Sequence, residues 1–368
     1  MNSPNNDKKI TKYEIIKQYI LSLIESQMLK PGDKLPTEEE LSEQFSVSLT
    51  TTRRAFLDLA RDGVICRIKK KGTFVNQATS PAIPNKATSQ IVAFILPLSE
   101  RTDNNLMQHV RGAQKYFSDR GYSMLIIATN DSVESENYFI NKAIQDQLSG
   151  LIIFPVSPEE NSELFLKLRQ HNIPFVLVDR YPNGMSVNSV VCDNFDGSFQ
   201  ATEHLIRLGH QKIQFITFAG SNQAEMVRHN GYCMAMKTNG LCSDYPILSY
   251  QQKEEVLQKI YSEQFTAFIC ANDYCALELL QFLSTEGISV PEDVSIIGFD
   301  GQRATEFVTP PLTTVFQPCY EIGSSAAELL VDIIENSSKK LTQHVLPVRL
   351  DIRKSTAPPK DLTKKYQS

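Results

Sequence analysis

Residues 35–75, LPTEEELSEQFSVSLTTTRRAFLDLARDGVICRIKKKGTFV, predict two helices, a tight turn between them and two short strands. Thr37 and Glu40 have the spacing of a capping box, in which a hydroxyl and a carboxylate each accept a hydrogen bond from a backbone N–H group at the helix start. Ser48 is a good N-cap for the second helix, and Gly63 supplies the left-handed residue that ends it. The apolar residues expected to face inward are Leu41, Phe45, Ala55, Phe56 and Leu59.

The two strands, residues 64–68 and 73–75, are joined by a Lys-Lys-Lys-Gly tip at 69–72, which predicts a β-hairpin with three positive charges. A further helix over residues 11–28 precedes the pair and is expected to pack across it. Helix, turn, helix and charged hairpin are the parts of a winged helix-turn-helix, in which the second helix enters the major groove of DNA.

The second helix carries side chains suited to DNA. Hydroxyl groups in its first turn can bond phosphates or base edges, and Arg53 offers a bidentate fork to guanine or phosphate. The alternative is a small helical subdomain with a solvated basic hairpin, and the basic tip together with the hydroxyl-rich first turn argues against it. Glu38, Glu39 and Glu40 are expected to form a solvated first turn that complements the helix dipole. The residues predicted to contact DNA are Thr37, Ser48, Thr50, Thr51, Arg53, Arg54, Lys69, Lys70, Lys71 and Gly72.

This stretch resembles the winged-helix DNA-binding domain of the GntR family of bacterial regulators, through LPTEEELSEQF, TTTRRAF, LARDG and KGTFV. By position, the resemblance implies that Gly72 approaches the minor groove and that the DNA backbone and bases are contacted by Ser48, Thr50, Thr51 and Arg53. Glu39 and Leu49 stand where the family usually has arginines, so two of its DNA contacts are absent. Arg54 and the lysines at 69–71 can compensate electrostatically.

At 368 residues the chain is long enough for two or three domains, and its hydrophobic content of 41% supports real cores. It has no apolar run of about 18 residues, so no membrane span is expected, and its polar N-terminus lacks the apolar segment of a secretory signal. Its seven scattered cysteines include no C-x-x-C pair and are expected to be buried free thiols in a reducing cytoplasm.

The charge of the chain is unevenly distributed. Residues 1–80 hold 13 Lys/Arg against 10 Asp/Glu, a net charge of +3. Because the whole chain has a net charge of −5, residues 81–368 carry −8. A basic N-terminal part on an acidic body suits a DNA-binding head joined to a domain that does not bind DNA.

Residues 76–89, NQATSPAIPNKATS, have no periodic apolar face and are predicted to form a linker. From residue 91 onward, short apolar runs alternate with helices. Strands this apolar are buried on both faces, which predicts parallel sheets covered by helices. Two consecutive α/β sets of similar size predict two lobes with a cleft between them. The expected strands are residues 91–97, 122–128, 150–156, 173–179, 212–218, 267–271 and 294–300.

In open α/β sheets, ligands bind beyond the carboxyl ends of the strands. Polar residues at those positions are therefore candidate ligand contacts: Ser99, Asp179, Arg180, Asn272, Asp273 and Asp300.

At these residues, and over residues 90–356, the chain resembles the effector-binding domain of the LacI/GalR repressors, itself similar to periplasmic sugar-binding proteins. The strongest stretches are ATEHLIRLGHQKIQFIT, VRHNGYCMAM, FICANDYCALELLQFL, GISVPEDVSIIGFD and PPLTTVFQP. The resemblance implies that an effector in the cleft is bound by the R-x-x-G-Y arginine, the GFD aspartate, the AND asparagine and the VD aspartate, here Arg228, Asp300, Asn272 and Asp179. Asp-Asn-Asn at 103–105 stands where the family usually has an aromatic pair, so the pocket is implied but its ligand is not. The winged domain replaces the LacI-type head and hinge helix.

Asp179 and Asp300 are also a candidate catalytic pair, as glycoside hydrolysis requires, although aspartate at a strand end is equally a good turn or cap residue. Arg228 favours binding, because an arginine between two carboxylates keeps both ionised and leaves neither ready to donate a proton. Carboxylates that accept from vicinal hydroxyls and an arginine that donates to ring oxygens suit a polyol. His204 and His210 are expected to be structural, because their spacing does not place them on one helical face.

The predicted fold is α/β, with an N-terminal winged helix-turn-helix domain followed by a two-lobed parallel α/β periplasmic-binding-protein-like domain. The predicted divisions are a winged domain at 1–77, a linker at 78–89, an effector domain at 90–357 and a polar tail at 358–368.

The predicted function is that of a cytoplasmic, dimeric, ligand-responsive repressor of a carbohydrate-utilisation operon. Its partners are double-stranded operator DNA and a sugar or sugar phosphate, with no cofactor, metal, catalytic residue or membrane. The alternatives are a sugar-binding protein without a DNA role and a glycoside- or nucleoside-processing enzyme that uses Asp179 and Asp300. The dimer interface is expected around the helix that carries Val110, Ala113 and Phe117.

Overall fold

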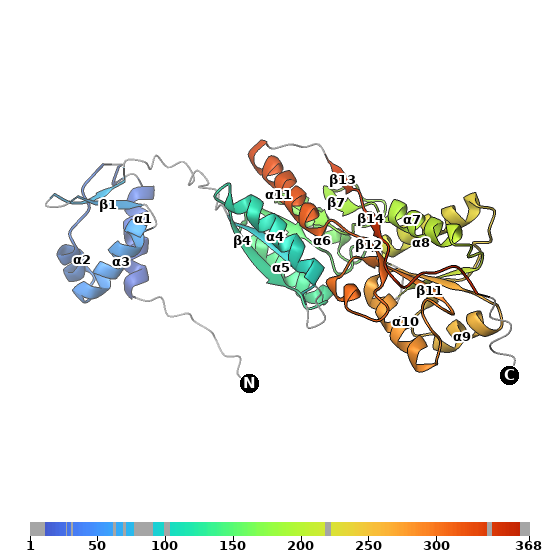
Figure 1. Ribbon diagram of the computed structural model, residues 1–368. Coiled ribbons are helices and arrows are strands. Elements are labelled where there is room, and N and C mark those ends of the chain that lie inside the picture. The colour runs from blue at the N-terminus through green and yellow to red at the C-terminus, as the bar shows by residue number, and fades with distance from the viewer. Residues whose placement is uncertain are drawn as a thin grey trace, which may run out of the picture. The chain divides into compact units, whose positions relative to one another are not determined.

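The computed structural model describes residues 12–26, 28–30, 32–61, 64–68, 71–76, 91–98, 104–217, 222–336 and 341–360. They belong to two compact units that divide between residues 88 and 89 (Figure 1). Several predicted features lie outside the described residues: Gly63, Lys69, Lys70, Ser99, the linker at 78–89 and residues 361–368 of the tail.

Within the described residues, the N-terminal unit has three helices and one antiparallel strand pair: α1 (Lys12–Glu25), α2 (Glu38–Gln44), α3 (Leu49–Arg61), β1 (Ile65–Ile68) and β2 (Gly72–Val75). Helix α3 packs against both α1 and α2. The side chains at the centre of this unit are at most 1% exposed: Ile16, Ile20, Leu41, Ala55, Phe56 and Leu59. The predicted order of a winged helix-turn-helix is confirmed.

Both predicted helix starts in this unit are confirmed. The Thr37 hydroxyl accepts from the backbone N–H of Glu40 at 3.2 Å, and the Glu40 carboxylate accepts from the backbone N–H of Thr37 at 2.7 Å. The Ser48 hydroxyl accepts from the backbone N–H of Thr51 at 3.2 Å. Between the strands, Gly72 has a φ of 121°, which L side chains rarely adopt, so the tight hairpin requires glycine there.

Lobe 1 of the C-terminal unit is built on a six-stranded parallel sheet with the order β13-β7-β6-β5-β3-β4. The strands are β3 (Ile91–Leu96), β4 (Ser123–Ala128), β5 (Gly150–Ile153), β6 (Phe175–Val178), β7 (Ser189–Cys192) and β13 (Gln343–Leu346). Helices α4 and α11 lie side by side on one face, and α5 and α6 cover the other (Figure 1). Their bounds are α4 (Asn104–Ser118), α5 (Val133–Gln145), α6 (Ser162–Gln170) and α11 (Cys319–Asn336).

Lobe 2 is built on a second six-stranded sheet, with the order β14-β12-β11-β10-β8-β9, in which only β14 runs antiparallel to its neighbour. The strands are β8 (Ile213–Thr217), β9 (Leu248–Ser249), β10 (Ala267–Cys270), β11 (Ser295–Asp300), β12 (Thr313–Phe316) and β14 (Arg349–Asp351). Helices α7 and α8 cover one face, and α9 and α10 the other. The helices are α7 (Asn194–Arg207), α8 (Gln223–Thr238), α9 (Lys253–Tyr261), α10 (Asp273–Thr285) and the 3-10 turn η1 (Arg303–Glu306).

All seven strands expected from the apolar runs are present, and six of them are almost wholly buried as predicted. Strand β4 is the exception, because it forms the edge of the lobe 1 sheet. Its Leu125 and Ile126 side chains are 47% and 48% exposed. An apolar run therefore predicted this strand correctly but not its burial.

The two lobes are not consecutive in the chain, which differs from the prediction. Within the described residues the chain passes from one lobe to the other after Cys192, after Phe316 and after Leu346. Helix α11 and strand β13 return to lobe 1, and β14 then completes lobe 2. The chain therefore connects the two lobes by three crossings.

The dimer interface expected around the helix that carries Val110, Ala113 and Phe117, which is α4, stays a prediction. These three side chains are at most 1% exposed, because they form the inward face of α4. Helices α4 and α11 also approach too closely for side chains between them: a Cβ on Gly112 would lie 2.0 Å from the Tyr320 carbonyl oxygen.

None of the helices that the structure describes combines the length and apolar character that a bilayer crossing requires.

Candidate functional site

The carboxyl ends of the parallel strands of both lobes border one cavity of about 220 Å³. Sites for drug-sized molecules have roughly 300–1,000 Å³, so this cavity suits a ligand of the size of a single sugar ring. Its walls combine the apolar side chains of Leu106 and Phe154 with carboxylates, arginines and amides. These polar residues are Asp131, Asp179, Glu225, Asp300, Arg180, Arg228, Asn105, Asn222, Asn272 and Gln317.

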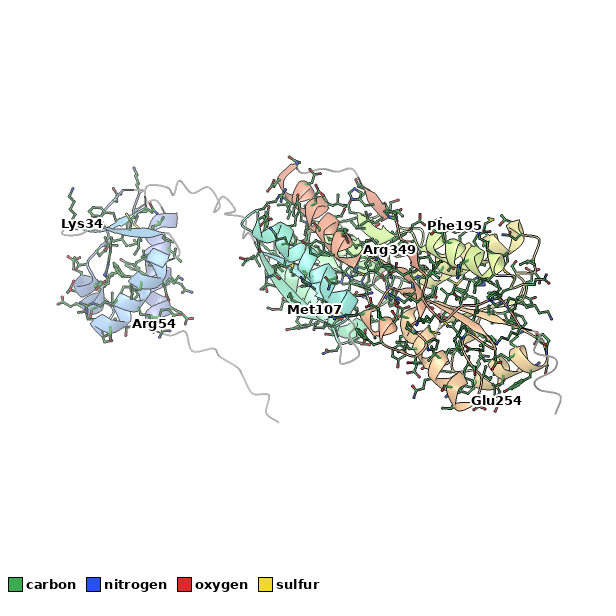
Figure 2. The ribbon with its side chains drawn as sticks, in the orientation of Figure 1. Lys34, Arg54, Met107, Phe195, Glu254 and Arg349 are labelled. Carbon is green, nitrogen blue, oxygen red and sulfur yellow. The ribbon has the colours of Figure 1, made fainter. Side chains whose placement is uncertain are left out.

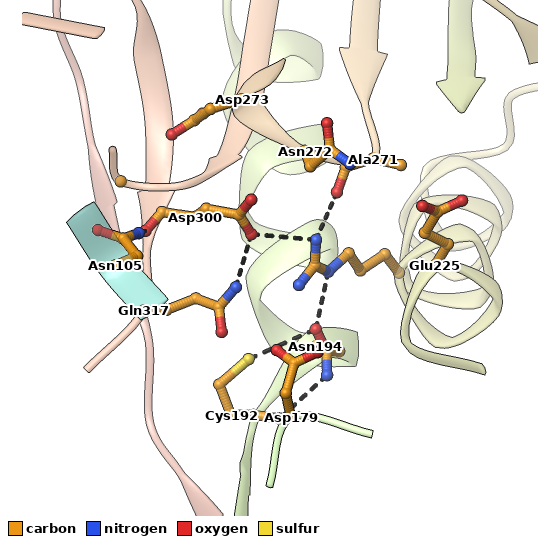
Figure 3. A network of polar contacts seen from close by, with 12 residues as sticks. Asn105, Asp179, Cys192, Asn194, Glu225, Ala271, Asn272, Asp273, Asp300 and Gln317 are labelled. Carbon is orange, nitrogen blue, oxygen red and sulfur yellow. Dashed lines mark hydrogen bonds and ion pairs between the residues drawn. The ribbon is translucent and has the colours of Figure 1, made fainter. Parts of the chain in front are cut away.

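Arg228 is the most buried cation of the cavity, at 5% exposure. Its Nε donates to Asn194 Oδ1 at 2.7 Å, and its Nη1 donates to the Ala271 carbonyl at 2.5 Å and to Asp300 Oδ1 at 3.3 Å (Figure 3). The guanidinium carbon lies 3.7 Å from the centroid of the Phe299 ring. Among the described residues nothing bonds Nη2, so its N–H groups can donate to a ligand.

The R-x-x-G-Y pattern explains how α8 presents this arginine. A Cβ on Gly231 would lie 2.2 Å from the Phe195 carbonyl oxygen, so glycine lets α8 pack directly on α7. Tyr232, one turn after Arg228, is 1% exposed and donates its hydroxyl to the Ile213 carbonyl at 2.7 Å. Burial alone would lower the pKa of Arg228, but the Asp300 carboxylate and other nearby anions raise it above its ordinary value. The arginine therefore stays charged.

Asp300 brings both lobes together at the end of β11. Its Oδ1 accepts from Gln317 Nε2 at 2.6 Å as well as from Arg228. Its backbone carbonyl accepts from Asn105 Nδ2 of lobe 1 at 2.7 Å. The φ of Asp300 is 114°, a conformation that is costly for any residue except glycine. Its carboxylate is thus held in a fixed position at the cavity wall.

Asp179 and Arg180 form the opposite wall at the end of β6. Arg180 Nε donates to Asp179 Oδ2 at 3.1 Å, and the Arg180 guanidinium carbon lies 5.0 Å from the centroid of the Phe154 ring. Asp179 has a φ of 68° and is 9% exposed. Arg228, expected near both carboxylates, forms its ion pair with Asp300 and has Asp179 as a further nearby anion, while Asp179 itself is paired with Arg180.

Two buried carboxyls support the walls. The carboxyl of Glu225 on α8 accepts a hydrogen bond from the Thr217 hydroxyl and another, at 3.3 Å, from Asn222 Nδ2. Glu136 on α5 receives the backbone N–H of Val156 at 2.7 Å and fixes the loop that follows β5. Burial raises the pKa of both glutamates above the ordinary value, although their hydrogen bonds partly oppose this effect.

The structure thus gathers five predicted contacts around one cavity: Asp179, Arg180, Arg228, Asn272 and Asp300. Asp273, also a candidate, does not line it. Asn272 caps α10 by accepting from the backbone N–H of Cys275 at 2.8 Å. Asn105, Glu225 and Gln317 were not predicted. Gln317 directly follows β12, so its strand-end position would have indicated it if that strand had been expected.

The cavity can therefore recognise a polyhydroxylated molecule, because its carboxylates accept from hydroxyl groups and its arginines and amides donate. Within the described part of the chain, no group of three His, Cys, Asp or Glu side chains is arranged to hold a metal ion. The seven cysteines are unpaired, and Cys242 is exposed, which differs from the expectation that all are buried. His210 is structural as predicted, since its Nε2 donates to the Ala357 carbonyl at 2.9 Å.

On the N-terminal unit, Glu38 is a central residue and not a solvated one. Its carboxylate pairs with Arg53 of α3 at 3.0 Å and also with Arg67 of β1, and its side chain is only 11% exposed. The expectation that the first turn of α2 is solvated is therefore wrong for Glu38. The Glu38 carboxylate therefore connects α2 to both α3 and β1. Arg67 was not among the predicted DNA contacts.

The remaining predicted DNA contacts are distributed over the surface of this unit. Thr50, Arg54, Lys71 and Gly72 are exposed, while the Ser48 hydroxyl lies 2.8 Å from the hydroxyl oxygens of Thr50 and Thr51. Lys34 and Arg54 both extend from the surface (Figure 2). A Cβ on Gly72 would lie 2.7 Å from Lys34 Cε, so Lys34 adds a positive charge beside the hairpin tip. The Arg54 guanidinium carbon lies 5.0 Å from the centroid of the Tyr13 ring.

Two family models match the chain: bacterial regulatory proteins of the gntR family over residues 12–75, and a periplasmic binding protein-like domain over residues 202–356. The arabinose metabolism transcriptional repressor of Geobacillus stearothermophilus is 33% identical over 95% of this chain and 99% of that protein. The arabinose metabolism transcriptional repressor of Halalkalibacterium halodurans is 30% identical over 94% of this chain and 97% of that protein. A solved LacI family transcriptional regulator from Enterococcus faecium, with bound ribose, has a TM-score of 0.63 and 26% identity over 73% of this chain and 100% of that one.

Proposed function

The chain belongs to the family of bacterial transcriptional repressors that join a GntR-type winged helix-turn-helix to a LacI-type effector-binding domain, and from that premise we propose how it responds to its effector. It is a carbohydrate-related transcriptional repressor. We propose that a single sugar binds in the cavity between the lobes and changes the affinity for operator DNA. Arabinose is the first sugar to test, because two relatives are named for its metabolism.

One observation carries this proposal: the cavity is walled by hydrogen-bonding groups of both lobes. Asp179 and Arg180 belong to lobe 1, whereas Arg228 and Asp300 belong to lobe 2. A ligand shifts a conformational equilibrium only by its different affinities for the two states. A sugar that bonds both walls at once does so only when the lobes are closed, so its binding energy favours closure.

Binding is favoured over catalysis by the ion pairs of the cavity. Asp179 is paired with Arg180 at 3.1 Å and Asp300 with Arg228 at 3.3 Å. Each carboxylate is thus engaged by a guanidinium and is placed to accept hydrogen bonds from the hydroxyl groups of a ligand. We propose that the protein is not an enzyme. If it releases products from a bound glycoside or nucleoside, this part of the proposal is wrong.

For the DNA, we propose that α3 enters the major groove and that the hairpin contacts the neighbouring backbone and minor groove. Arg53 and the hydroxyls at the start of α3 are the proposed base and phosphate contacts. Lys34, Arg67, Lys71 and the two preceding lysines supply positive charge. We propose that the protein acts in the cytoplasm, where the DNA of a bacterium lies.

We propose that the protein is a homodimer whose interface includes the exposed edge of lobe 1. Strand β4 has no neighbour on its outer side within the described residues, and it exposes Leu125 and Ile126. Tyr138 of α5 is 63% exposed. An apolar edge strand invites pairing with another chain, and two winged units related by symmetry match a palindromic operator.

The direct test combines a DNA assay with a chemical one. Genomic fragments that the protein retains are footprinted, and its affinity for the protected site is measured with and without arabinose. We expect one or more palindromic sites and a change in affinity on adding the sugar. Nuclear magnetic resonance of the sugar after incubation should show no product. Sequence-independent binding that no monosaccharide alters would refute the proposal.

A further inference from the structure

We propose that Asp273, a residue that does not line the cavity, positions Asp300 for ligand binding by holding the two backbone amides that follow it. This inference rests on the proposed function, in which the cavity binds a sugar. Asp273 is 0% exposed at the start of α10, whereas the Asp300 carboxylate is in the cavity wall (Figure 3). Asp273 is thus a positioning residue, since it reaches the ligand only through Asp300.

The contacts of Asp273 lead to both amides after Asp300. Its Oδ2 accepts from the backbone N–H of Gln302 at 2.7 Å. Its Oδ1 accepts from the Thr314 hydroxyl at 2.5 Å, and that hydroxyl oxygen accepts in turn from the backbone N–H of Gly301 at 3.3 Å. One buried carboxyl therefore fixes two consecutive peptide groups, directly in one case and through Thr314 in the other.

The segment from Asp300 to Gln302 has a backbone conformation that depends on these hydrogen bonds. Asp300 has a φ of 114° and Gly301 one of 67°, and the former is a conformation that a residue with a side chain keeps only when its surroundings impose it. If the amides of Gly301 and Gln302 were released, Asp300 could relax to an ordinary φ. Its carboxylate would then move away from Arg228 and Gln317, which it meets at 3.3 Å and 2.6 Å.

The glycine of the GFD pattern fits the same account. A Cβ on Gly298 would lie 2.2 Å from Asp273 Oδ1, so only glycine at this position lets the carboxyl reach the strand end. Gly298 and Asp300 are two residues apart on β11. The pattern thus combines a space for the positioning carboxyl with the residue that it positions.

The first test uses two neighbouring threonines of β12. Thr314 and Thr313 are both 0% exposed, and each hydroxyl accepts one backbone N–H, that of Gly301 for Thr314 and that of Arg353 at 2.9 Å for Thr313. The dissociation constant for arabinose is measured by calorimetry. Thr314→Val loses both the bond from the Gly301 amide and the bond to the Asp273 carboxyl, which predicts at least about three- to tenfold weaker binding. Thr313→Val, with the same change in shape, should stay within about twofold.

The second test changes the carboxyl itself. Asp273→Asn keeps an oxygen for the Gln302 amide and gains an N–H group for the Thr314 hydroxyl, so it should retain most of the arabinose affinity. Asp273→Ala loses both contacts and should bind at least about tenfold more weakly. Asp293→Ala is the matched control. Asp293 is 5% exposed, precedes strand β11 and does not line the cavity, and its carboxylate accepts from the backbone N–H of Ser289 at 2.8 Å.

Hydrogen exchange separates a failure of this inference from a failure of the proposed function. The exchange rates of the Gly301 and Gln302 amides are measured without any sugar, and they should rise in Asp273→Ala and Thr314→Val but not in the two controls. If wild-type protein binds neither arabinose nor other monosaccharides, the proposed function fails while the exchange rates still test the inference. Unchanged exchange in Asp273→Ala, or arabinose affinity reduced no more than in Asp293→Ala, would overturn it.

Discussion

Glu38 accepts contacts from arginines of both the second helix and the hairpin, so this one carboxylate limits the free positive charge of the DNA-binding surface. We expect Glu38→Gln to release Arg53 and Arg67, because the neutral amide no longer holds them. Non-specific binding should then tighten, and the slope of log affinity against log salt should steepen by about one to two units. Discrimination between operator and random DNA should fall, because Arg53 loses its fixed orientation.

A salt titration with operator and random duplexes checks this prediction. Arg53→Ala serves as the comparison and should cost roughly 1–3 kcal/mol of operator binding, with little effect on random DNA beyond one lost charge. Equal salt slopes for wild type and Glu38→Gln would show that DNA binding does not involve the freed arginines.

The lowered pKa of His210 makes the stability of the C-terminal unit depend on pH. Burial lowers its pKa to about 4, although its bond to the Ala357 carbonyl opposes this shift. Because the pKa of His210 in the folded protein lies below the usual 6.5, the unfolded chain binds a proton between pH 6.5 and 4 and the folded protein does not. The stability of the folded protein therefore falls as the pH decreases from 6.5 towards 4. Between pH 7 and 5 the loss from this residue is about 2 kcal/mol.

Denaturant unfolding at pH 7 and pH 5 measures this effect. His210→Asn should be less stable than wild type at pH 7, because Thr266, Ser295 and Ala357 lose a shared partner. The same variant should lose less stability on acidification. His171→Asn, at an exposed position, should keep the pH dependence of wild type. If His210→Asn and wild type lose equal stability, His210 is not the group that titrates.

At the residue scale, sequence patterns located Asp179, Arg228, Asn272 and Asp300 because each lies beside a buried strand or in a recognisable segment. They did not show which arginine pairs with which aspartate, since that depends on distances across the cleft. Glu38 was misjudged for a similar reason. Three glutamates in a first helical turn predict solvation, and only the packing of α3 and β1 beside Glu38 reveals its two partners.

At the scale of elements, long apolar runs identified strands reliably, but short strands and sheet edges were not recognised. Strands β7 (SVVC) and β12 (TTVF) begin with hydroxyl side chains and have apolar runs of only two or three residues, too short to indicate a buried strand. Helix α11 was not expected, although it covers much of lobe 1. The exposed side chains of β4 illustrate the same limit, because edge position is a property of the sheet and not of the strand.

The edge of β4 gives a prediction at this scale. Wild-type protein at micromolar concentration should sediment near twice 41.5 kDa. Leu125→Asp should sediment as a monomer, because a carboxylate on the edge of β4 would have to be buried without a partner. Leu166→Asp is the control: Leu166 lies on α6 and has the same 47% exposure as Leu125. Dimers of unchanged stability in Leu125→Asp would place the interface on another face.

At the scale of the whole molecule, the two lobes of the C-terminal unit are joined by three crossings of the chain and meet around one polar cavity. Asn105 of lobe 1 already donates to the Asp300 carbonyl of lobe 2 at 2.7 Å, so contact between the lobes does not require a ligand. To shift the equilibrium from 1:99 to 99:1, a ligand must bind the closed state about 10⁴-fold more tightly. Contacts with both walls are the means of achieving such a difference.

We propose that the cavity between the lobes controls operator binding. Operator affinity, measured with and without the sugar in cavity variants, tests this proposal. For arabinose, or whichever monosaccharide alters wild-type binding, Arg228→Ala and Asp300→Ala should each abolish the response and leave sugar-free operator affinity near that of wild type. Arg207→Ala, with a side chain 77% exposed on lobe 2, should respond normally. A full response to the sugar in either cavity variant would show that this cavity does not control operator binding.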